Sequence, residues 1–333
     1  MRARPLAVTL GDPAGIGPEI VAAAWAALRT SGPAFVAIGD ARLLARWGPV
    51  SPISACASAE AKFAEALPVI DQPLPEPPTP GQPSAAAAPL IVRWIETAVR
   101  LALLGEASGI VTAPIAKATL YEAGFAYPGH TEFVGTLTAE APFAGARGPV
   151  MMLTAKDLRA ALVTVHEPLA RVPALLTEAR IVQAGEVLAE ALMRDFEIAR
   201  PRIAIAGLNP HAGEAGRLGD EESKVVTPAA DALRAKGLDV RGPLPADSMF
   251  HDAARATYDA ALCLYHDQAL IPVKMLDFWG GVNVTLGLPV VRTSPDHGTA
   301  FDIAGKGIAR ADSLIAATRL AAQIAERRAL VCA

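Results

Sequence analysis

Residues that can bind metals and anions are concentrated in the last third of the sequence. They are His266, Asp267, Lys274, Asn283, Arg292 and the run 295–307, PDHGTAFDIAGKG. Folding alone does not need such a density of chemical groups. Two permanent cations and an amide after a His-Asp pair suit a small anionic substrate held beside a metal ion. Lys274 and Arg292 lie in apolar stretches, which argues against ordinary solvent-exposed charges.

Three of the six histidines follow strand-like apolar segments. They are His166, His211 and His266. Open α/β sheets place their sites at the carboxyl ends of their strands, so these side chains are candidates for one site. Three neutral imidazoles with an open position are typical ligands of a catalytic zinc or similar divalent ion. A single such histidine is more often a loop or core residue, so the prediction depends on the set of three.

Three residues are candidates for moving protons, namely Asp247, Asp267 and Lys274. Asp247 and Asp267 are also candidates for orienting a metal-bound histidine without binding the metal themselves. Either aspartate is equally suited to cap a helix N-terminus. The Gly-rich residues 11–19, GDPAGIGPE, lie between a predicted strand and a predicted helix, where a binding loop and a tight structural turn are both compatible with the sequence.

Short β-rich runs alternate with longer helical runs, which predicts an α/β protein with mostly parallel sheets. The predicted strands are 6–10, 35–38, 109–112, 150–153, 158–164, 203–207, 260–265 and 282–286, and the predicted helices are 19–29, 85–104, 171–192, 221–236 and 311–327. Residues 150–164 look like a hairpin, so some antiparallel pairing is expected. Residues 68–83 carry seven prolines and are expected to form a surface connector, with neither a helix nor a central strand.

Composition limits the classes of function. A chain of 333 residues favours two domains, and a net charge of -4 gives no field that would collect nucleic acid or anionic lipid. The three cysteines are widely spaced and suggest neither a disulfide framework nor a thiolate zinc site. No stretch resembles a secretion signal or a membrane span. We therefore expect a cytoplasmic protein with a small-molecule partner.

Seven motifs are spread in order along nearly the whole chain. They are residues 10–19, 112–117 (TAPIAK), 128–133 (PGHTEF), 208–214 (LNPHAGE), 242–247 (GPLPAD), 265–268 (YHDQ) and 296–307. Together they resemble the 4-hydroxythreonine-4-phosphate dehydrogenase family of vitamin B6 synthesis. The first and last motifs are also similar to the wider isocitrate and isopropylmalate dehydrogenase fold, whose His-Gly-Ser/Thr-Ala loop embraces the adenosine part of NAD.

This resemblance implies two α/β/α domains with mixed sheets and a central cleft. Residues 1–127 with 290–333 would form the cofactor-side domain, and residues 128–289 the domain for metal, substrate and dimerisation. It implies that His166, His211 and His266 bind one divalent metal (Zn, Mg or Co) with ligands contributed across a homodimer interface. The implied substrate-binding residues are His130, Thr131, Lys274, Asn283 and Arg292. The implied contacts to NAD or NADP are His297, Gly298, Thr299 and Asp302.

The implied reaction is an NAD-dependent, metal-assisted oxidative decarboxylation of 4-phosphooxy-L-threonine to 3-amino-2-oxopropyl phosphate. The chain departs from the family pattern at Ala116, where Asn is common, and at residues 216–219, which often carry Met. One alternative is therefore a paralogue acting on 4-phospho-threonate or 4-phospho-erythronate. A metal-dependent hydrolase, using the three histidines to activate water, and an acyl-phosphate transferase are two further hypotheses.

Overall fold

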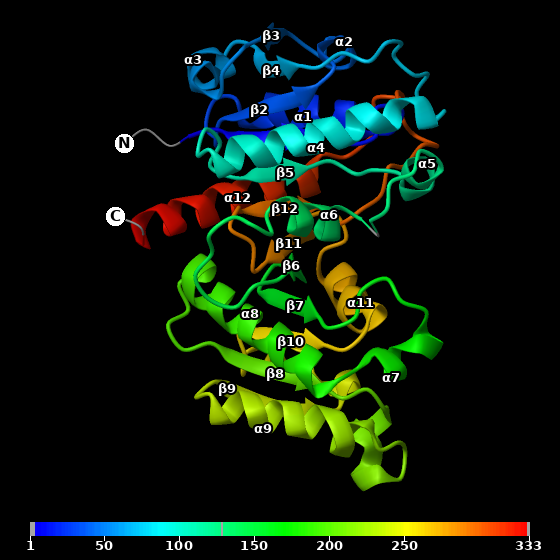
Figure 1. The fold of residues 1–333 in the computed structure, drawn as a ribbon, viewed down its shortest axis with the longest axis vertical. Coiled ribbons are helices and arrows are strands. Elements are labelled where there is room, and N and C mark those ends of the chain that lie inside the picture. Colours follow the sequence, from blue (N-terminus) through cyan, green and yellow to red (C-terminus); the bar gives the residue numbers. More distant parts are fainter. Residues whose placement is uncertain (1–3, 128, 332–333) are drawn as a thin grey trace. The chain divides into compact units, whose positions relative to one another are not determined.

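The computed structural model describes residues 4–127 and 129–331, and the chain divides into two compact units (Figure 1). The first comprises Met1–Pro142 and Leu288–Ala329, and the second comprises Phe143–Gly287 with the residues from Leu330 onward. The sequence predicts a boundary after residue 127. The structure instead assigns the following stretch to the first unit, because helix α6 (His130–Leu137) packs against α4 (Ala88–Leu103).

The first unit contains a parallel arrangement of six strands in the order β3-β4-β2-β1-β5-β12. The strands are β1 (Leu6–Thr9), β2 (Phe35–Gly39), β3 (Val50–Pro52), β4 (Leu67–Asp71), β5 (Ile110–Thr112) and β12 (Arg292–Pro295). The residues of β1, β2 and β5 are all buried, as expected of parallel strands covered on both faces. Their carboxyl ends lie at one edge, which places the loops that follow them together.

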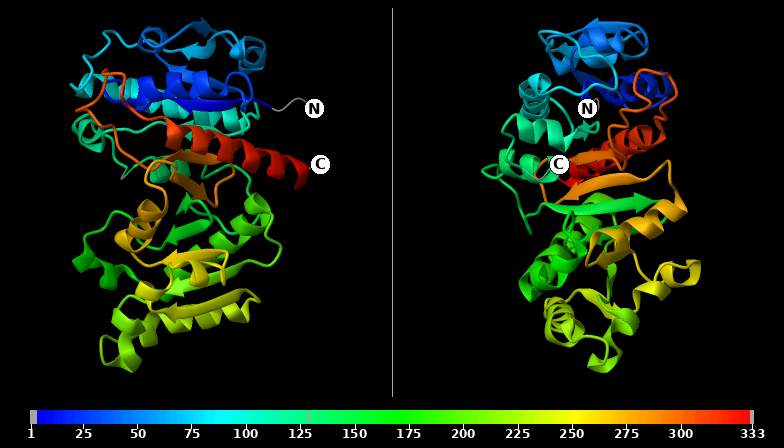
Figure 2. Two further views of the ribbon diagram at one scale, coloured as in Figure 1. Left: turned by 180° about the vertical axis from the view of Figure 1, so that it is seen from behind. Right: turned by 90° about the vertical axis from the view of Figure 1, so that its right-hand side faces the viewer.

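Helices cover both faces of these strands. In the right-hand view of Figure 2, α4 (cyan) lies on one side and α1 (dark blue) on the other. The longest helices are α1 (Gly17–Leu28), α4 and α12 (Asp312–Val331), and the shorter ones are α2 (Ala41–Leu44), α3 (Ala59–Phe63), α5 (Lys117–Glu122) and α6. Helix α4 is amphipathic and buries Ile91, Trp94 and Ile95 at helical spacing.

The second unit contains a mixed arrangement in the order β11-β6-β7-β10-β8-β9. Its strands are β6 (Val150–Ala155), β7 (Leu158–Leu162), β8 (Arg202–Ala206), β9 (Asp239–Leu244), β10 (Ala260–Cys263) and β11 (Val282–Leu286). Strands β6 and β7 form the predicted antiparallel hairpin, with Met152 opposite Ala161, and β11 is antiparallel to β6. The expectation of a mixed α/β protein is thus confirmed.

The helices of the second unit are α7 (Val172–Leu175), α8 (Glu178–Phe196), α9 (Thr227–Ala235), α10 (Asp252–Arg255) and α11 (His266–Leu276). The single helix predicted over 171–192 is wrong. It is two helices, because Leu176 is extended and the Thr177 side chain accepts a hydrogen bond from the Arg180 N–H, which starts α8 as an N-cap.

The prediction that residues 68–83 contain no central strand is also wrong. Strand β4 includes Pro68 and lies between β3 and β2. It tolerates the proline because the donors around it are bonded: the Leu67 N–H donates to the Pro49 carbonyl at 2.9 Å and the Gln72 N–H to the Gly39 carbonyl at 2.8 Å. Strands β3, β9 and β12 and helix α11 were not predicted. Strands β3 and β12 are short, β9 contains Gly242 and Pro243, and α11 contains Pro272.

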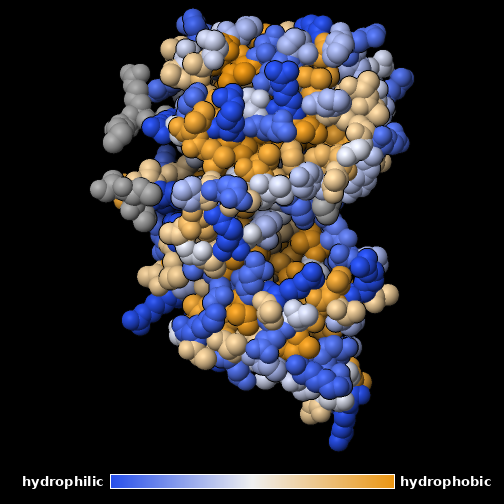
Figure 3. Space-filling view, in the orientation of Figure 1, coloured by the Kyte–Doolittle hydropathy of each residue, from blue (hydrophilic) through white to orange (hydrophobic). Residues whose placement is uncertain are grey.

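The surface agrees with the modest net charge. On the face drawn in Figure 3, hydrophilic residues are interspersed with hydrophobic ones over both units. In the described part of the chain, every helix falls short of the length and apolar character that crossing a bilayer requires.

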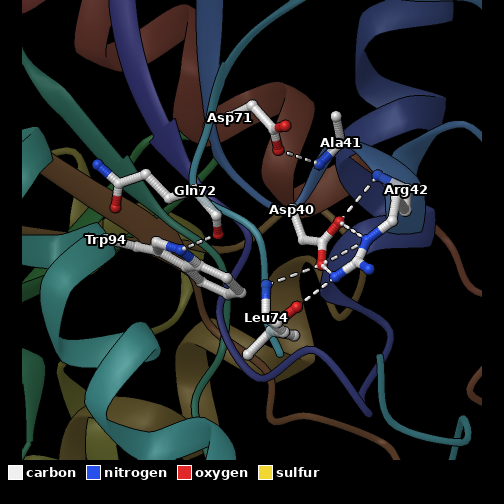
Figure 4. Close-up of polar contacts among 7 residues, drawn as sticks. All are labelled: Asp40, Ala41, Arg42, Asp71, Gln72, Leu74 and Trp94. Atoms are coloured by element: carbon white, nitrogen blue, oxygen red, sulfur yellow. Dashed lines mark hydrogen bonds and ion pairs between the residues drawn. The ribbon is translucent and has the colours of Figure 1, made fainter. Parts of the chain in front are cut away.

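A buried carboxylate organises the end of β2 (Figure 4). The Asp40 side chain is 0% exposed. It accepts hydrogen bonds from the backbone N–H groups of Arg42 (2.9 Å) and Leu74 (3.0 Å) and from the Arg42 guanidinium (2.7 Å). It therefore caps α2 and ties this helix to the segment that follows β4.

Two further bonds in Figure 4 hold the same segment. The Asp71 carboxylate accepts from the Ala41 N–H at 2.9 Å, and the Trp94 indole N–H donates to the Gln72 carbonyl at 3.1 Å. The Pro-rich connector is thus anchored where it leaves the sheet.

Replacing Asp40 by Asn is expected to lower the free energy of unfolding by about 2 kcal/mol, because an amide N–H₂ would face the donors of Arg42. Burial tends to raise the pKa of Asp40, but hydrogen bonds from Arg42 and Leu74 outweigh it and hold the pKa below the ordinary value. The difference in the free energy of unfolding between wild type and Asp40→Asn should therefore be complete above about pH 4. It should disappear as the pH falls through the pKa of Asp40 in the folded state.

Chemical denaturation at several pH values measures this difference. Asp312→Asn is the control, because Asp312 forms an exposed pair with Arg310 and should contribute less than about 1 kcal/mol. Equal losses in the two variants would contradict a central role for Asp40.

Candidate active site

Three loops of the first unit meet at the carboxyl ends of its strands. The Gly-rich turn after β1 contacts the loop after β5, where the Asp12 N–H donates to the Pro114 carbonyl at 2.8 Å. It also contacts the loop after β12, where the Ile16 N–H donates to the Thr299 carbonyl at 3.0 Å. Gly11 has a φ of +68°, and a Cβ there would lie 2.2 Å from the Pro114 carbonyl oxygen. The turn therefore requires glycine in order to bring the loops together.

Beside these loops lies a group that we call the basic cluster, formed by Lys117, His130, Glu132 and Arg292. Lys117 is the first residue of α5, His130 is the first residue of α6, and Arg292 is the first residue of β12. The Arg292 side chain is almost fully buried, and its Nη2 donates to Thr112 Oγ1 at 2.8 Å. The structure thus brings together two of the predicted substrate residues, His130 and Arg292.

The groups of the basic cluster perturb one another. Burial lowers the pKa of Arg292 to about 10, and Glu132 partly opposes this shift. Burial also lowers the pKa of Lys117, again against the charge of Glu132. The pKa of His130 lies well below its ordinary value because of burial first and then the charges of Arg292 and Lys117. His130 is therefore neutral at pH 7, and its Nε2 is buried without a hydrogen-bond partner among the described residues.

The four predicted cofactor residues lie in the loop after β12. Thr299 contacts the Gly-rich turn, and a Cβ on Gly15 would lie 2.9 Å from the Thr299 carbonyl oxygen. The Nδ1 atom of His297 lies 3.1 Å from the Gly298 carbonyl oxygen, and Asp302 is exposed. Next to this loop is a pocket of about 240 Å³, whose lining includes Gly15, Glu19, Trp47 and Gly305. None of the four predicted residues is among those that line it.

In the second unit, two of the predicted metal ligands are close together. The rings of His166, which follows β7, and His266, which starts α11, have centroids 5.7 Å apart. His266 Nδ1 lies 2.7 Å from Asp267 Oδ1, which leaves Nε2 directed elsewhere, as in many metal sites. His211 lies in the 3-10 segment Pro210–Gly216 after β8 and has a φ of +52°. Within one chain, the described residues bring no three metal-binding side chains together.

The remaining predicted residues lie in the same unit. The Lys274 ammonium is 5.1 Å from the centroid of the Phe278 ring. The Asn283 side chain is half-buried on β11, and its Oδ1 has no hydrogen-bond partner in the described chain. Asp247 is exposed in the segment Ala246–Ser248.

Neither aspartate is a helix N-cap, because Pro245 and Tyr265 hold those positions before the segments that contain Asp247 and Asp267. The capping alternative raised by the sequence is therefore excluded. Thr131 follows His130 in the first turn of α6, in the first unit.

A family model described as pyridoxal phosphate biosynthetic protein PdxA matches residues 32–321. The chain belongs to this family. A PdxA-family relative from Caulobacter vibrioides, named 4-hydroxythreonine-4-phosphate dehydrogenase, is 63% identical over 98% of this chain and 99% of its own length. The crystal structure of a 4-hydroxythreonine-4-phosphate dehydrogenase from Klebsiella pneumoniae has a TM-score of 0.84 and 40% identity, covering 97% of this chain and 98% of that chain.

A further relative carries a different name. The crystal structure of a terephthalate 1,2-cis-dihydrodiol dehydrogenase from Burkholderia xenovorans has a TM-score of 0.65 and 30% identity, with coverage of 97% of this chain and 98% of that chain. Dehydrogenases with different names therefore share this fold. The names of these relatives support a dehydrogenase and give no support to a hydrolase.

Sequence reasoning missed Lys117 and Glu132 as members of a site. Both lie within motifs that resemble those of the PdxA family, TAPIAK at 112–117 and PGHTEF at 128–133, and this was the available signal. Their proximity to Arg292 arises from the pairing of β5 with β12, which the sequence does not reveal.

The imidazole of His130 is expected to titrate well below pH 6.5, and Lys117→Gln should raise its pKa by removing a nearby positive charge. Because the folded state resists protonation, the unfolded state binds more protons below about pH 6.5, and stability should fall as the pH drops through that range. NMR titration of the histidine resonances measures this, with His130→Asn identifying the signal. A midpoint at or above 6.5 would contradict the buried cationic environment.

Proposed function

We propose that this chain oxidises and decarboxylates 4-phosphooxy-L-threonine to 3-amino-2-oxopropyl phosphate in pyridoxal phosphate synthesis, with NAD as hydride acceptor. The main support is the near full-length similarity to relatives that bear the name of this dehydrogenase. The predicted site residues are all present in the sequence, and the basic cluster is a suitable partner for an anionic substrate. A cytoplasmic location accompanies this metabolic role.

A divalent metal fits the second unit, and zinc, magnesium and cobalt are all compatible with the family. The adjacent imidazoles of His166 and His266, with Asp267 orienting His266, form an incomplete ligand set of the type that such ions use. When bound, the metal would supply Lewis acidity that favours loss of the hydroxyl proton and stabilises negative charge during loss of carbon dioxide.

The missing ligand points to a homodimer. Since one chain does not bring His166, His211 and His266 together, we infer that a second copy completes the set. The α11 region presents exposed apolar side chains close to this site, with Ile271, Met275, Phe278 and Trp279 being 59%, 83%, 58% and 50% exposed. Exposed large apolar side chains grouped in this way are typical of an interface.

The protein side chains would then bind, orient and transfer protons. Lys274 and Asn283 would hold polar groups of the substrate, and the neutral Nε2 of His130 would provide a further contact. The proton of the hydroxyl passes to a base as hydride passes to the nicotinamide. Because Asp267 holds His266, its role is orientation, which leaves Asp247 and Lys274 as the candidates for the base.

We propose NAD, with NADP as the alternative, on the loop that contains His297, Gly298, Thr299 and Asp302. Exposed Asp302 favours NAD, since a carboxylate suits a ribose hydroxyl and repels a phosphate. Steady-state measurements that compare the KM for NAD with the KM for NADP test this assignment.

Substrate identity is tested by following NADH formation with a divalent metal and each of three compounds, namely 4-phosphooxy-L-threonine, 4-phospho-threonate and 4-phospho-erythronate. We expect the amino acid to give a kcat/KM at least about 10-fold higher, because an amine that contacts the metal or a carboxylate is worth more than about 1.4 kcal/mol. A preference for either acid without the amine would show a catabolic paralogue, an outcome that Ala116 and the differently named relative make worth testing.

Shared metal ligands predict complementation between inactive variants. His166→Ala, His211→Ala and His266→Ala should each lose metal and turnover. Pairwise mixing, after dissociation and reassociation, should restore roughly a quarter of wild-type activity when the two ligands come from different subunits, because half of the random dimers are mixed and each has one intact site.

Two ligands contributed by the same subunit should not complement. The pattern of pairs therefore shows which histidine comes from the second copy. Failure of all three pairs, with dimers still formed, would rule out a shared metal site.

A further inference from the structure

Three neighbouring strands of the second unit each lead to one of the three histidines. Strand β10 is parallel to β7 on one side and to β8 on the other. His166 follows β7, His211 follows β8, and His266 follows β10. Because neighbouring parallel strands end at the same edge of a sheet, the placement of these side chains depends on how the strand ends are fixed to one another.

The side chain of Gln268 joins two of these strand ends. Gln268 lies in the first turn of α11 and is only 6% exposed. Its Oε1 accepts a hydrogen bond from the Leu264 N–H at 2.7 Å, and its Nε2 donates to the Gly207 carbonyl at 2.7 Å. Leu264 directly follows β10 and Gly207 directly follows β8. One amide therefore links the segment that carries His266 to the segment that carries His211.

The end of β7 is bonded to the same peptide. Thr164 is buried two residues before His166, and its Oγ1 donates a hydrogen bond to the Leu264 carbonyl at 2.6 Å. Leu264 thus bonds Gln268 through its N–H and Thr164 through its carbonyl. These hydrogen bonds run without a break from the end of β7, through the end of β10, to the end of β8.

We propose that Gln268 is a positioning residue for the metal site, which fixes the segments of His211 and His266 without touching the ion. The proposal rests on the proposed function, because it takes the three histidines as metal ligands. Leu264 offers a donor and Gly207 an acceptor, so the side chain between them must both accept and donate, as an amide does. Ligands must be held close to one geometry, whichever subunit contributes them, and buried hydrogen bonds of this kind provide the support.

The opposite ends of the same strands provide a matched control. Asp259 directly precedes β10, and its carboxylate accepts hydrogen bonds from the backbone N–H of Arg202 at 2.8 Å and from the Arg202 guanidinium at 3.0 Å. Arg202 is the first residue of β8. Gln268 and Asp259 therefore both join β8 to β10, but Asp259 does so at the edge away from the histidines. Variants at either position should lose stability, whereas weaker metal binding should be confined to variants of Gln268.

Titration of the protein with Co²⁺, followed by calorimetry and by visible absorption, tests the proposal without turnover. Gln268→Met keeps the length of the side chain and removes both hydrogen bonds. It should weaken Co²⁺ binding about 10- to 100-fold and alter the absorption bands of the bound ion, because the ligands are no longer held in place. Gln268→Glu keeps the acceptor for the Leu264 N–H and loses the donor to Gly207, so it should also bind Co²⁺ more weakly than wild type.

Asp259→Ala should keep the Co²⁺ affinity and spectrum of the wild type, and chemical denaturation shows how much stability each variant has lost. A wild-type affinity and spectrum in Gln268→Met would overturn the proposal, as would equal losses of affinity in Gln268→Met and Asp259→Ala. If Gln268→Met does not fold, Gln268→Glu decides the question by the same comparison.

The outcome for Gln268 can be distinguished from the outcome for the proposed function. If the wild-type enzyme turns over none of the phosphorylated compounds but its Co²⁺ binding depends on the three histidines and on Gln268, the positioning role stands and the assigned reaction fails. If turnover is found and Co²⁺ affinity is independent of Gln268, the reaction stands and the positioning role fails. A wild-type protein that binds no Co²⁺ would overturn the positioning role together with the metal assignment.

Discussion

The close approach of backbone segments at the Gly-rich turn is the constraint on which the first unit depends. A Cβ on Gly11 would lie 2.2 Å from the Pro114 carbonyl oxygen, and one on Gly15 would lie 2.9 Å from the Thr299 carbonyl oxygen. A Cβ on Gly17 would lie 1.9 Å from the Leu10 carbonyl oxygen, within the turn itself. A side chain at Gly11 or Gly15 would push the turn away from the loops after β5 and β12. Those loops and the strands that lead into them carry Lys117, Arg292 and the predicted cofactor residues, so the geometry of the candidate site depends on glycine at positions 11 and 15.

Two buried polar groups in this unit show opposite ways of balancing charge. Asp40 accepts several hydrogen bonds and an ion pair, so its burial is compensated and it fixes the structure (Figure 4). The basic cluster instead holds two cations and a neutral histidine against one carboxylate. The hydrogen bonds of Asp40 contribute to stability, whereas in the basic cluster burial lowers the pKa values of Lys117, His130 and Arg292.

The second unit holds the three residues proposed as metal ligands. His166 and His266 lie side by side and Asp267 orients one of them, but the described chain does not assemble three ligands. Apolar side chains on and after α11 are exposed in the same region. Both observations have one explanation if a second copy of the chain covers this surface, and this links the proposed activity to assembly.

The sequence by itself determined the α/β class, the hairpin of β6 and β7, most strands and the PdxA-family motifs, because these depend on local patterns and on residue order. Its assignments of metal, substrate and cofactor residues stay predictions. Only the tertiary structure decided that Pro68 lies within β4, that residues 171–192 form two helices, and that Lys117 and Glu132 join Arg292. The pairing of β5 with β12 brings together segments about 180 residues apart, and such contacts depend on packing that no local pattern encodes.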